Sequence, residues 1–142
     1  MLSQTGVYAI RAMSCLVSES KKDDKPVLGR TIAEKMQIPS NFLSKILNRL
    51  VQAGFIRSVR GRSGGFHLAK PSSEITLRDI VDLFMPSNDY KNCLLGLNKC
   101  NGGCGLYHRW RNITEQYNLM LNETTIDKIF KQVAPRRKND AI

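Results

Sequence analysis

The chain has 142 residues, of which 42% are hydrophobic and 24% are charged, a composition typical of a globular protein and unlike that of a disordered chain. Ten glycines and five prolines exclude a collagen-like or linker-type chain, and the length is short for an enzyme with an elaborate active-site cleft. The formal net charge of +10 predicts a polyanionic partner, which is either a nucleic acid or an acidic membrane surface.

No stretch of the sequence approaches the roughly 20 consecutive apolar residues that a membrane-spanning helix needs. The first residues lack the basic segment of a secretory signal, and Arg11 interrupts the apolar run that such a signal requires. We therefore expect a cytoplasmic protein, in a reducing compartment where structural disulfides are rare. A membrane partner is not expected, because the main cluster of basic residues, at 40–70, falls on the pattern of a winged helix-turn-helix and not on a membrane-facing amphipathic helix.

The first part of the chain predicts two helices that lead into a third. Apolar residues recur at helical spacing over 5–18, and a charged loop that ends in proline is expected at 19–26. A short second helix follows, with Thr31 and Glu34 at capping-box spacing. A tight turn then places Ser40 as the expected N-cap of the third helix.

The third helix has the clearest periodicity in the sequence. Its apolar stripe consists of Phe42, Leu43, Ile46, Leu47, Leu50 and Val51. Gly54 is expected to end it. Two strands, 55–60 and 66–69, then flank a glycine-rich tip, and a fourth helix runs from Thr76 until Pro86 closes it. This order predicts a winged helix-turn-helix domain over residues 1–85, in which the hairpin is the wing.

The remainder of the chain changes character twice. Residues 86–105 show no periodicity and form a cysteine-bearing loop, which we interpret as a sensor segment. A short heptad seam of Leu106, Trp110, Ile113, Tyr117 and Met120 then predicts a helix that pairs within an oligomer. This dimerisation helix and a last short helix, to which Val133 contributes, occupy 106–134, and a basic tail covers 135–142. The expected fold is mainly α, with a small β-hairpin wing and a long C-terminal dimerisation helix.

The third helix and the wing carry the candidate DNA contacts. Residues 40–70 contain six basic side chains and no Asp or Glu, whereas a surface helix normally mixes its charges. The candidate DNA-binding residues are Ser40, Asn41, Ser44, Lys45, Asn48 and Arg49 on the helix, and Arg60, Arg62 and Ser63 at the wing tip. The alternative is an ordinary amphipathic helix with a solvated polar face.

Three of the four cysteines are clustered, while Cys15 lies alone on an apolar segment and is interpreted as a small buried hydrophobic residue. Cys93, Cys100 and Cys104 are soft thiolate ligands suited to an iron–sulfur cluster or to zinc. A closed site needs a fourth ligand, which is His108, a residue of a partner subunit or a small molecule. Free thiols, a redox disulfide or the absence of any function remain as alternatives.

The sequence resembles the Rrf-two family of bacterial transcription regulators over residues 1 to about 130. The matching stretches are LSQTGVYAIRAM, IPSNFLSKILNRLVQAGFIRSVRGRSGGFHLAK, CLLGLNKC and CGLYHRW. The resemblance implies a homodimer that binds a palindromic DNA operator through the third helix and the wing. It also implies a repressor whose DNA affinity depends on an iron–sulfur cluster, of the 2Fe–2S or 4Fe–4S type, bound by the three clustered cysteines.

The chain departs from the family pattern at the fourth ligand. The position three after Cys104, often His in the family, is Tyr107 here, and His108 follows one step later. A shift of one residue turns a helical side chain by about 100°, which makes His108 a weak candidate. Other members take this ligand from the N-terminal helix of the partner subunit, where this chain has Gln4, Thr5 and Tyr8.

Two other functional classes compete with cluster sensing. Because some family members use no cluster, the same fold acting through thiol oxidation or a protein or metabolite partner is the main alternative. An enzyme is not expected, since no general-base constellation, phosphate-binding loop or carboxylate cluster accompanies the cysteines and histidines. RNA binding is disfavoured by an aromatic content of only 7%.

Overall fold

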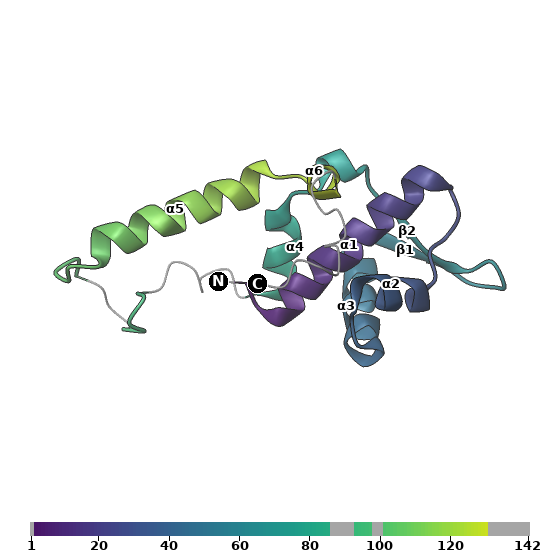
Figure 1. Cartoon of the computed structure of the whole chain (residues 1–142), viewed down its shortest axis with the longest axis horizontal. Helices are drawn as coiled ribbons and strands as arrows, with labels where there is room; N and C mark the ends of the chain where they lie inside the picture. Colours follow the sequence, from purple (N-terminus) through teal and green to yellow (C-terminus); the bar gives the residue numbers. More distant parts are fainter. Residues whose placement is uncertain (1, 86–92, 98–100, 131–142) are drawn as a thin grey trace, which may run out of the picture.

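The structure is a computed structural model and describes residues 2–85, 93–97 and 101–130 (Figure 1). Its elements are α1 (Gln4–Lys22), α2 (Gly29–Met36), α3 (Ser40–Gln52), β1 (Ile56–Val59), β2 (Gly65–Leu68), the 3-10 helix η1 (Ser72–Glu74), α4 (Leu77–Phe84), α5 (Tyr107–Glu123) and α6 (Ile126–Phe130). The predicted mainly helical fold with one antiparallel hairpin is confirmed. Pro86, Val133 and the basic tail at 135–142 lie outside the described residues. None of the helices that the structure describes has the length and apolar content needed to cross a membrane.

The hydrophobic core is built around α1, which packs against α2, α3, α4 and α6. Nine of the 19 residues of α1 are buried, because its apolar and small side chains face the other helices. The largest fully buried side chains are Met13, Leu16, Ile32, Ile46, Leu50, Ile56, Ile75, Ile80, Leu121, Ile126, Val17 and Val81. Since each such side chain contributes about 1.5–3 kcal/mol on burial, this core holds α2, α3 and the hairpin in one fixed arrangement.

The first helix is longer than the sequence pattern predicted. It continues to Lys22 and so includes the first half of the segment 19–26 that was expected to be a loop. The Glu19 carboxylate accepts hydrogen bonds from Lys22, at 3.0 Å, and from Lys35 of α2, at 2.7 Å. These bonds, that from Lys35 first, lower the pKa of Glu19. The charged residues therefore add a helical turn and pair it with α2, where charge content alone had indicated a loop.

Both helices around the tight turn begin at residues other than those predicted. The N-cap of α2 is Leu28, so Thr31 lies within the first turn and the capping box with Glu34 does not cap the helix. The N-cap of α3 is Pro39, so Ser40 is the first helical residue and not the cap. Neither cap donates or accepts through a side chain, because core packing, and not capping chemistry, decides where these helices start.

The end of α3 follows the prediction. Gly54 has φ 79°, the left-handed conformation that glycine adopts without steric cost. Its N–H donates to the Val51 carbonyl at 3.0 Å, and the Phe55 N–H donates to the Leu50 carbonyl at 3.1 Å. This pair of bonds is the Schellman motif, which turns the chain directly into β1.

The wing is a two-stranded antiparallel hairpin in which Ile56 pairs with Leu68 and Val59 pairs with Gly65. A third segment extends it. The Val27 N–H donates to the Phe66 carbonyl at 2.9 Å, and the Phe66 N–H donates to the Val27 carbonyl at 2.8 Å. These two bonds attach the hairpin to the chain just before α2, so the wing and α2 keep a fixed relative position.

One arginine joins α4 to α5. Arg78 donates to Asn118 at 2.6 Å, to Asn122 at 3.2 Å and to Asp82 at 3.2 Å, and its side chain is only 15% exposed. The N-terminus of α4 is itself fixed by a capping box between Thr76 and Asp79. Figure 1 shows that α5 projects away from the other helices and that its N-terminal end lies far from α2 and α3.

The projecting helix carries an uncovered apolar seam. Of the predicted heptad residues, Leu106, Ile113 and Met120 are 43%, 51% and 47% exposed, whereas Trp110 and Tyr117 are half-buried. An exposed apolar row of this kind is typical of an interface with another chain.

Phe42 departs from the predicted stripe of α3. It is 49% exposed, and its ring lies 6.2 Å from that of Tyr8 in a tilted contact. The apolar stripe that reaches the core is therefore narrower than predicted.

Candidate functional site

The polar face of α3 is exposed along its full length. Leu43, Ile46, Leu47 and Leu50 point into the core, and this fixes the rotation of the helix. All six predicted contact residues on α3, Ser40, Asn41, Ser44, Lys45, Asn48 and Arg49, are exposed. An exposed row of hydroxyl, amide and ammonium groups can donate to and accept from the base edges and phosphates of a duplex.

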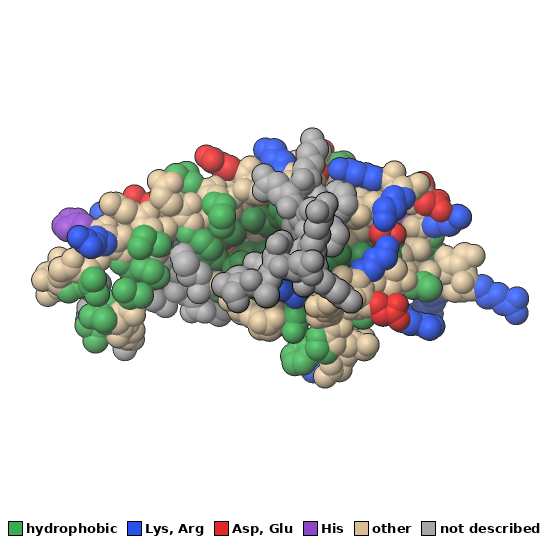
Figure 2. All heavy atoms as spheres, viewed as in Figure 1, with side chains coloured by type: hydrophobic (Ala, Val, Ile, Leu, Met, Phe, Trp, Pro, Cys, Tyr) green, Lys and Arg blue, Asp and Glu red, His purple; other side chains and the backbone are tan. Residues whose placement is uncertain are grey.

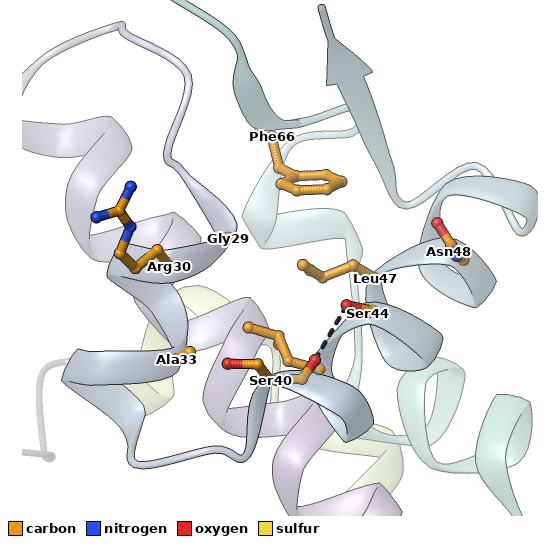
Figure 3. A pocket seen from close by; sticks show the side chains of 9 residues that line it. Gly29, Arg30, Ala33, Ser40, Ser44, Leu47, Asn48 and Phe66 are labelled. Carbon is orange, nitrogen blue, oxygen red and sulfur yellow. Dashed lines mark hydrogen bonds between the residues drawn. The ribbon is translucent and has the colours of Figure 1, made fainter.

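A groove of about 510 Å³ separates α3 from α2, and the hairpin covers one end of it. Figure 3 shows Ser40, Ser44 and Asn48 on the α3 wall and Phe66 of β2 above the two helices. The Ser44 hydroxyl donates to the Ser40 carbonyl at 3.0 Å, which leaves its oxygen lone pairs as acceptors. Asn48 makes no hydrogen bond to another side chain of the described residues, so its amide is available to an external partner.

Arg49 lies at the edge of the α3 face and contacts another helix. Its guanidinium carbon lies 5.5 Å from the centroid of the Phe84 ring on α4. Lys70 behaves similarly, with its ammonium 4.9 Å from the ring centroid of Phe55. Both cations belong to the acid-free window, yet each is held by an aromatic ring of this chain. The sequence could not show this, since each contact depends on how distant segments pack.

The wing tip carries the predicted Arg60, Arg62 and Ser63, all exposed. Glycine is required beside them. A Cβ on Gly64 would lie 2.5 Å from the Val59 carbonyl oxygen, and Gly61 has φ 114°. The tip is therefore a narrow turn that presents two guanidinium groups, a shape that fits the minor groove of DNA.

The charges on this face are unneutralised. The ion pairs that the structure describes join Glu19 to Lys22 and Lys35, Asp23 to Lys25, Arg78 to Asp82, and Arg111 to Glu115. Within the described part of the chain, Lys45, Arg60 and Arg62 have no such partner. Their positive potential is thus directed outward, toward an anionic surface.

The sequence pattern did not identify one further cation on this surface. Arg30, the second residue of α2, lines the same groove as Ser40, Ser44 and Asn48. The capping-box spacing of Thr31 and Glu34 had indicated Thr31 as the N-cap of this helix, which left Arg30 outside it. The sequence signal for it was its position two residues before Ile32, the buried residue of α2.

The second candidate site lies at the N-terminal end of α5. Cys93 and Cys104 line one small apolar pocket together with Leu95, Tyr107 and Trp110. The two thiols therefore face the same space although ten residues separate them, as soft ligands for one metal group would. Cys100 lies outside the described residues, and among the described ones no three His, Cys, Asp or Glu side chains converge on a common metal position.

The chain around these thiols folds tightly. Gly96 and Gly102 have φ 72° and 77°, and the Asn101 side chain accepts from the Gly103 N–H at 3.0 Å. Gly96 lies three residues after Cys93, and Gly102 lies two residues before Cys104.

His108 does not line the cysteine pocket, whereas Tyr107 does. The imidazole is exposed and packs edge-on against the Tyr107 ring at 5.2 Å between centroids. The rotation expected from its position in the sequence therefore directs His108 away from the two thiols.

Cys15 and Cys104 should differ sharply in reactivity. Cys15 is fully buried on α1, and burial raises the pKa of its thiol above the ordinary value of 9.0. At pH 8 it is therefore neutral and inaccessible, whereas Cys104 is exposed. In reduced, metal-free protein, we expect brief alkylation with iodoacetamide to label Cys104 at least about 100-fold faster than Cys15. Mass spectrometry of the peptides gives both rates.

The pH dependence follows from the same burial. A thiol whose folded-state pKa is raised contributes stability that is complete below its unfolded-state pKa, near 9.0, and is lost as the pH rises through the folded-state pKa. Replacement of Cys15 by Ala should therefore flatten the decline of stability above pH 9. Rapid native labelling of Cys15 would contradict the burial.

Comparison with known proteins identifies the family. The sequence model of Rrf2, described as an iron-dependent transcriptional regulator, matches residues 2–132. A helix-turn-helix transcriptional regulator of Aquifex aeolicus is 35% identical over 130 residues, covering 89% of this chain and 88% of the relative. The transcriptional regulator IscR of Yersinia enterocolitica is 32% identical over 146 residues, covering 98% and 87%.

The fold agrees with this assignment. The structure of CymR, the global cysteine regulator of Bacillus subtilis, superimposes with a TM-score of 0.74 at 21% identity, covering 94% of this chain and 98% of CymR. The expectation that the chain is not an enzyme is confirmed by the relatives, which are transcriptional regulators. The exposed α3 face, the wing and the matched sequences together show that this chain belongs to the Rrf2 family of winged-helix transcriptional regulators.

Proposed function

We propose that this regulator is a cytoplasmic homodimer that represses transcription by binding a palindromic DNA operator, and that an iron–sulfur cluster controls its affinity for that operator. The observation that carries the DNA-binding half is the set of exposed cations on α3 and the wing, which form no ion pair within the described part of the chain. The segment that contains them, 40–70, has no acidic residue. Repression follows from the simplest use of such a surface, which is to occupy DNA that the transcription machinery needs.

Two α3 helices must enter successive major grooves to read a palindrome. The exposed seam of Leu106, Ile113 and Met120 supports the dimer that this requires. Paired α5 helices would cover these side chains and relate the two α3 helices by a two-fold axis, so that each half-site meets an identical surface.

The cluster half rests on Cys93 and Cys104, which share one apolar pocket. Cys100, the third proposed ligand, lies between them in sequence. The thiolates suit an iron–sulfur group, and when bound it supplies a redox-sensitive link between these cysteines. Since His108 faces away from the pocket, we assign the fourth ligand to the partner subunit or to a small molecule, and His108 is not a ligand in this proposal.

The alternative is a metal-free regulator that responds through thiol oxidation or a bound partner. The exposure of Cys104 favours it, because an accessible thiol is open to oxidants. The similar fold of CymR, which is named a global cysteine regulator, is compatible with this alternative.

Anaerobic purification tests the cluster directly. We expect coloured wild-type protein that contains iron and has the native mass of a dimer. Ala at Cys93, Cys100 or Cys104 should abolish the colour, whereas Cys15→Ala, the matched control, should retain it because Cys15 is buried in the core. A colourless, iron-free wild-type preparation that binds DNA with the same affinity before and after reconstitution would contradict cluster control.

The DNA half is tested separately. Duplexes selected by the protein from a randomised pool should converge on an inverted repeat, with half-site centres separated by about one helical turn or a multiple of it. A selected set without two-fold symmetry would contradict the palindromic operator, and failure to enrich any duplex would contradict sequence-specific binding. Oxidation of metal-free protein that alters the affinity reversibly would favour the alternative.

A further inference from the structure

Arg30 stands on the rim of the groove that the DNA-reading face of α3 forms with α2. The same groove is lined by Ser40, Ser44 and Asn48, and Figure 3 shows Arg30 on α2, across the groove from Asn48 on α3. Arg30 is exposed, and within the described residues it takes part in no ion pair. Its guanidinium is thus a cation on the candidate DNA surface that the chain itself does not use.

The position of Arg30 separates it from the base-reading residues. When a recognition helix lies in the major groove, the first helix of the motif crosses the sugar–phosphate backbone at the edge of that groove. The two flanking backbones pass on either side of α3 because the major groove is only about 12 Å wide. A group on α2, across a groove from the α3 face, therefore meets a phosphate and not a base edge.

The relation of Arg30 to the wing supports the same assignment. Val27, three residues before Arg30, pairs with Phe66 of β2 through two backbone hydrogen bonds. Phe66 also lines the groove, so α2, α3 and the wing form one rigid surface around it. A duplex held by α3 in the major groove and by the wing in the minor groove must carry its intervening backbone past this surface.

We infer that Arg30 binds a backbone phosphate of the duplex, between the major-groove contact of α3 and the minor-groove contact of the wing. The inference rests on the proposed DNA-binding function and adds a contact to it. Arg49, by contrast, is held against Phe84, so we expect Arg30 to contribute more than Arg49 to the phosphates neutralised by each subunit.

A salt titration tests this assignment. Fluorescence anisotropy would measure the dissociation constants of wild type, Arg30→Ala and Arg30→Lys for two labelled duplexes, one of arbitrary fixed sequence and one selected by the wild-type protein. Between about 50 and 200 mM salt, Arg30→Ala should reduce the log–log slope by about 0.9 per subunit and weaken binding about tenfold at the low end. Arg30→Lys should retain most of the slope, since an ammonium also binds phosphate as a point charge.

The two duplexes separate a phosphate contact from a base contact. A phosphate contact predicts the same loss of affinity on both duplexes, whereas a loss confined to the selected duplex would overturn the assignment in favour of base reading. Arg109→Ala is the matched control, because Arg109 is exposed on the remote end of α5.

The same titrations also separate the role of Arg30 from the proposed DNA-binding function. If Arg60→Ala weakens binding while Arg30→Ala matches the wild type in affinity and slope, Arg30 is not a phosphate contact, although the DNA-binding function stands. If the wild-type protein binds neither duplex, the proposed function fails and the role of Arg30 fails with it.

Discussion

Replacing Gly65 with Ala should destabilise the protein by about 3 kcal/mol. Gly65 has φ 147°, a conformation that side chains rarely adopt, and a Cβ there would lie 2.5 Å from the Val27 carbonyl oxygen and 2.7 Å from its carbonyl carbon. These are backbone atoms that cannot move aside independently. The hairpin must therefore shift away from Val27 and lose the two hydrogen bonds between Val27 and Phe66.

Thermal unfolding measures the effect. At roughly 3 °C per kcal/mol for a chain of this size, Tm should fall by about 9 °C. Gly105→Ala is the control, because a Cβ at Gly105 meets no atom within 4 Å and its φ lies outside the left-handed range. Its Tm should match that of the wild type. An unchanged Tm for Gly65→Ala would show that the wing is not attached to the segment before α2 as the structure indicates.

How much of this fold could be predicted depends on whether the determining contacts are local in sequence. The Gly54 stop and the Gly61–Gly65 tip were predictable because glycine answers a local backbone requirement. The starts of α2 and α3 were not, since Leu28 and Pro39 occupy positions where polar caps are the usual signal. At the start of each of these two helices, the packing of buried residues against α1 outweighs capping.

The candidate site, too, was predictable where composition determines it and not where tertiary packing does. Charge counting located the candidate DNA surface, because the absence of acid over residues 40–70 is a property of composition. It could not tell which cations are available, since Arg49 and Lys70 lie against aromatic rings whose proximity depends on tertiary packing. For the same reason it missed Arg30, which joins the surface only through the placement of α2 beside α3.

The arrangement also offers a physical route between the cysteine segment and α3. Arg78 ties α5 to α4 through Asn118 and Asn122, and Phe84 at the end of α4 holds Arg49 of α3. A displacement of α5 must either break the bonds of Arg78 or move α4 with it. In the second case the Phe84 ring, which lies against Arg49 of α3, moves with α4.

The largest effect on DNA binding is expected from the wing. The double replacement Arg60→Ala, Arg62→Ala should weaken binding about 100-fold at low salt and reduce the log–log salt slope by about 1.8 per subunit, if each guanidinium neutralises one phosphate. Both side chains are exposed at the tip and lie outside the core, so the loss of charge is not accompanied by a loss of fold. Anisotropy titrations across salt concentrations give both quantities, and an unchanged Tm shows that the fold is retained.

The matched comparison is Arg49→Ala, which removes the same charge from the same acid-free window. Because that guanidinium lies against Phe84, its loss should leave the salt slope near the wild-type value and lower Tm instead. Equal reductions in slope for the wing variant and for Arg49→Ala would mean that position in the fold does not select the cations that meet DNA. A reduction confined to the wing variant would show that the aromatic contact withdraws Arg49 from the DNA surface.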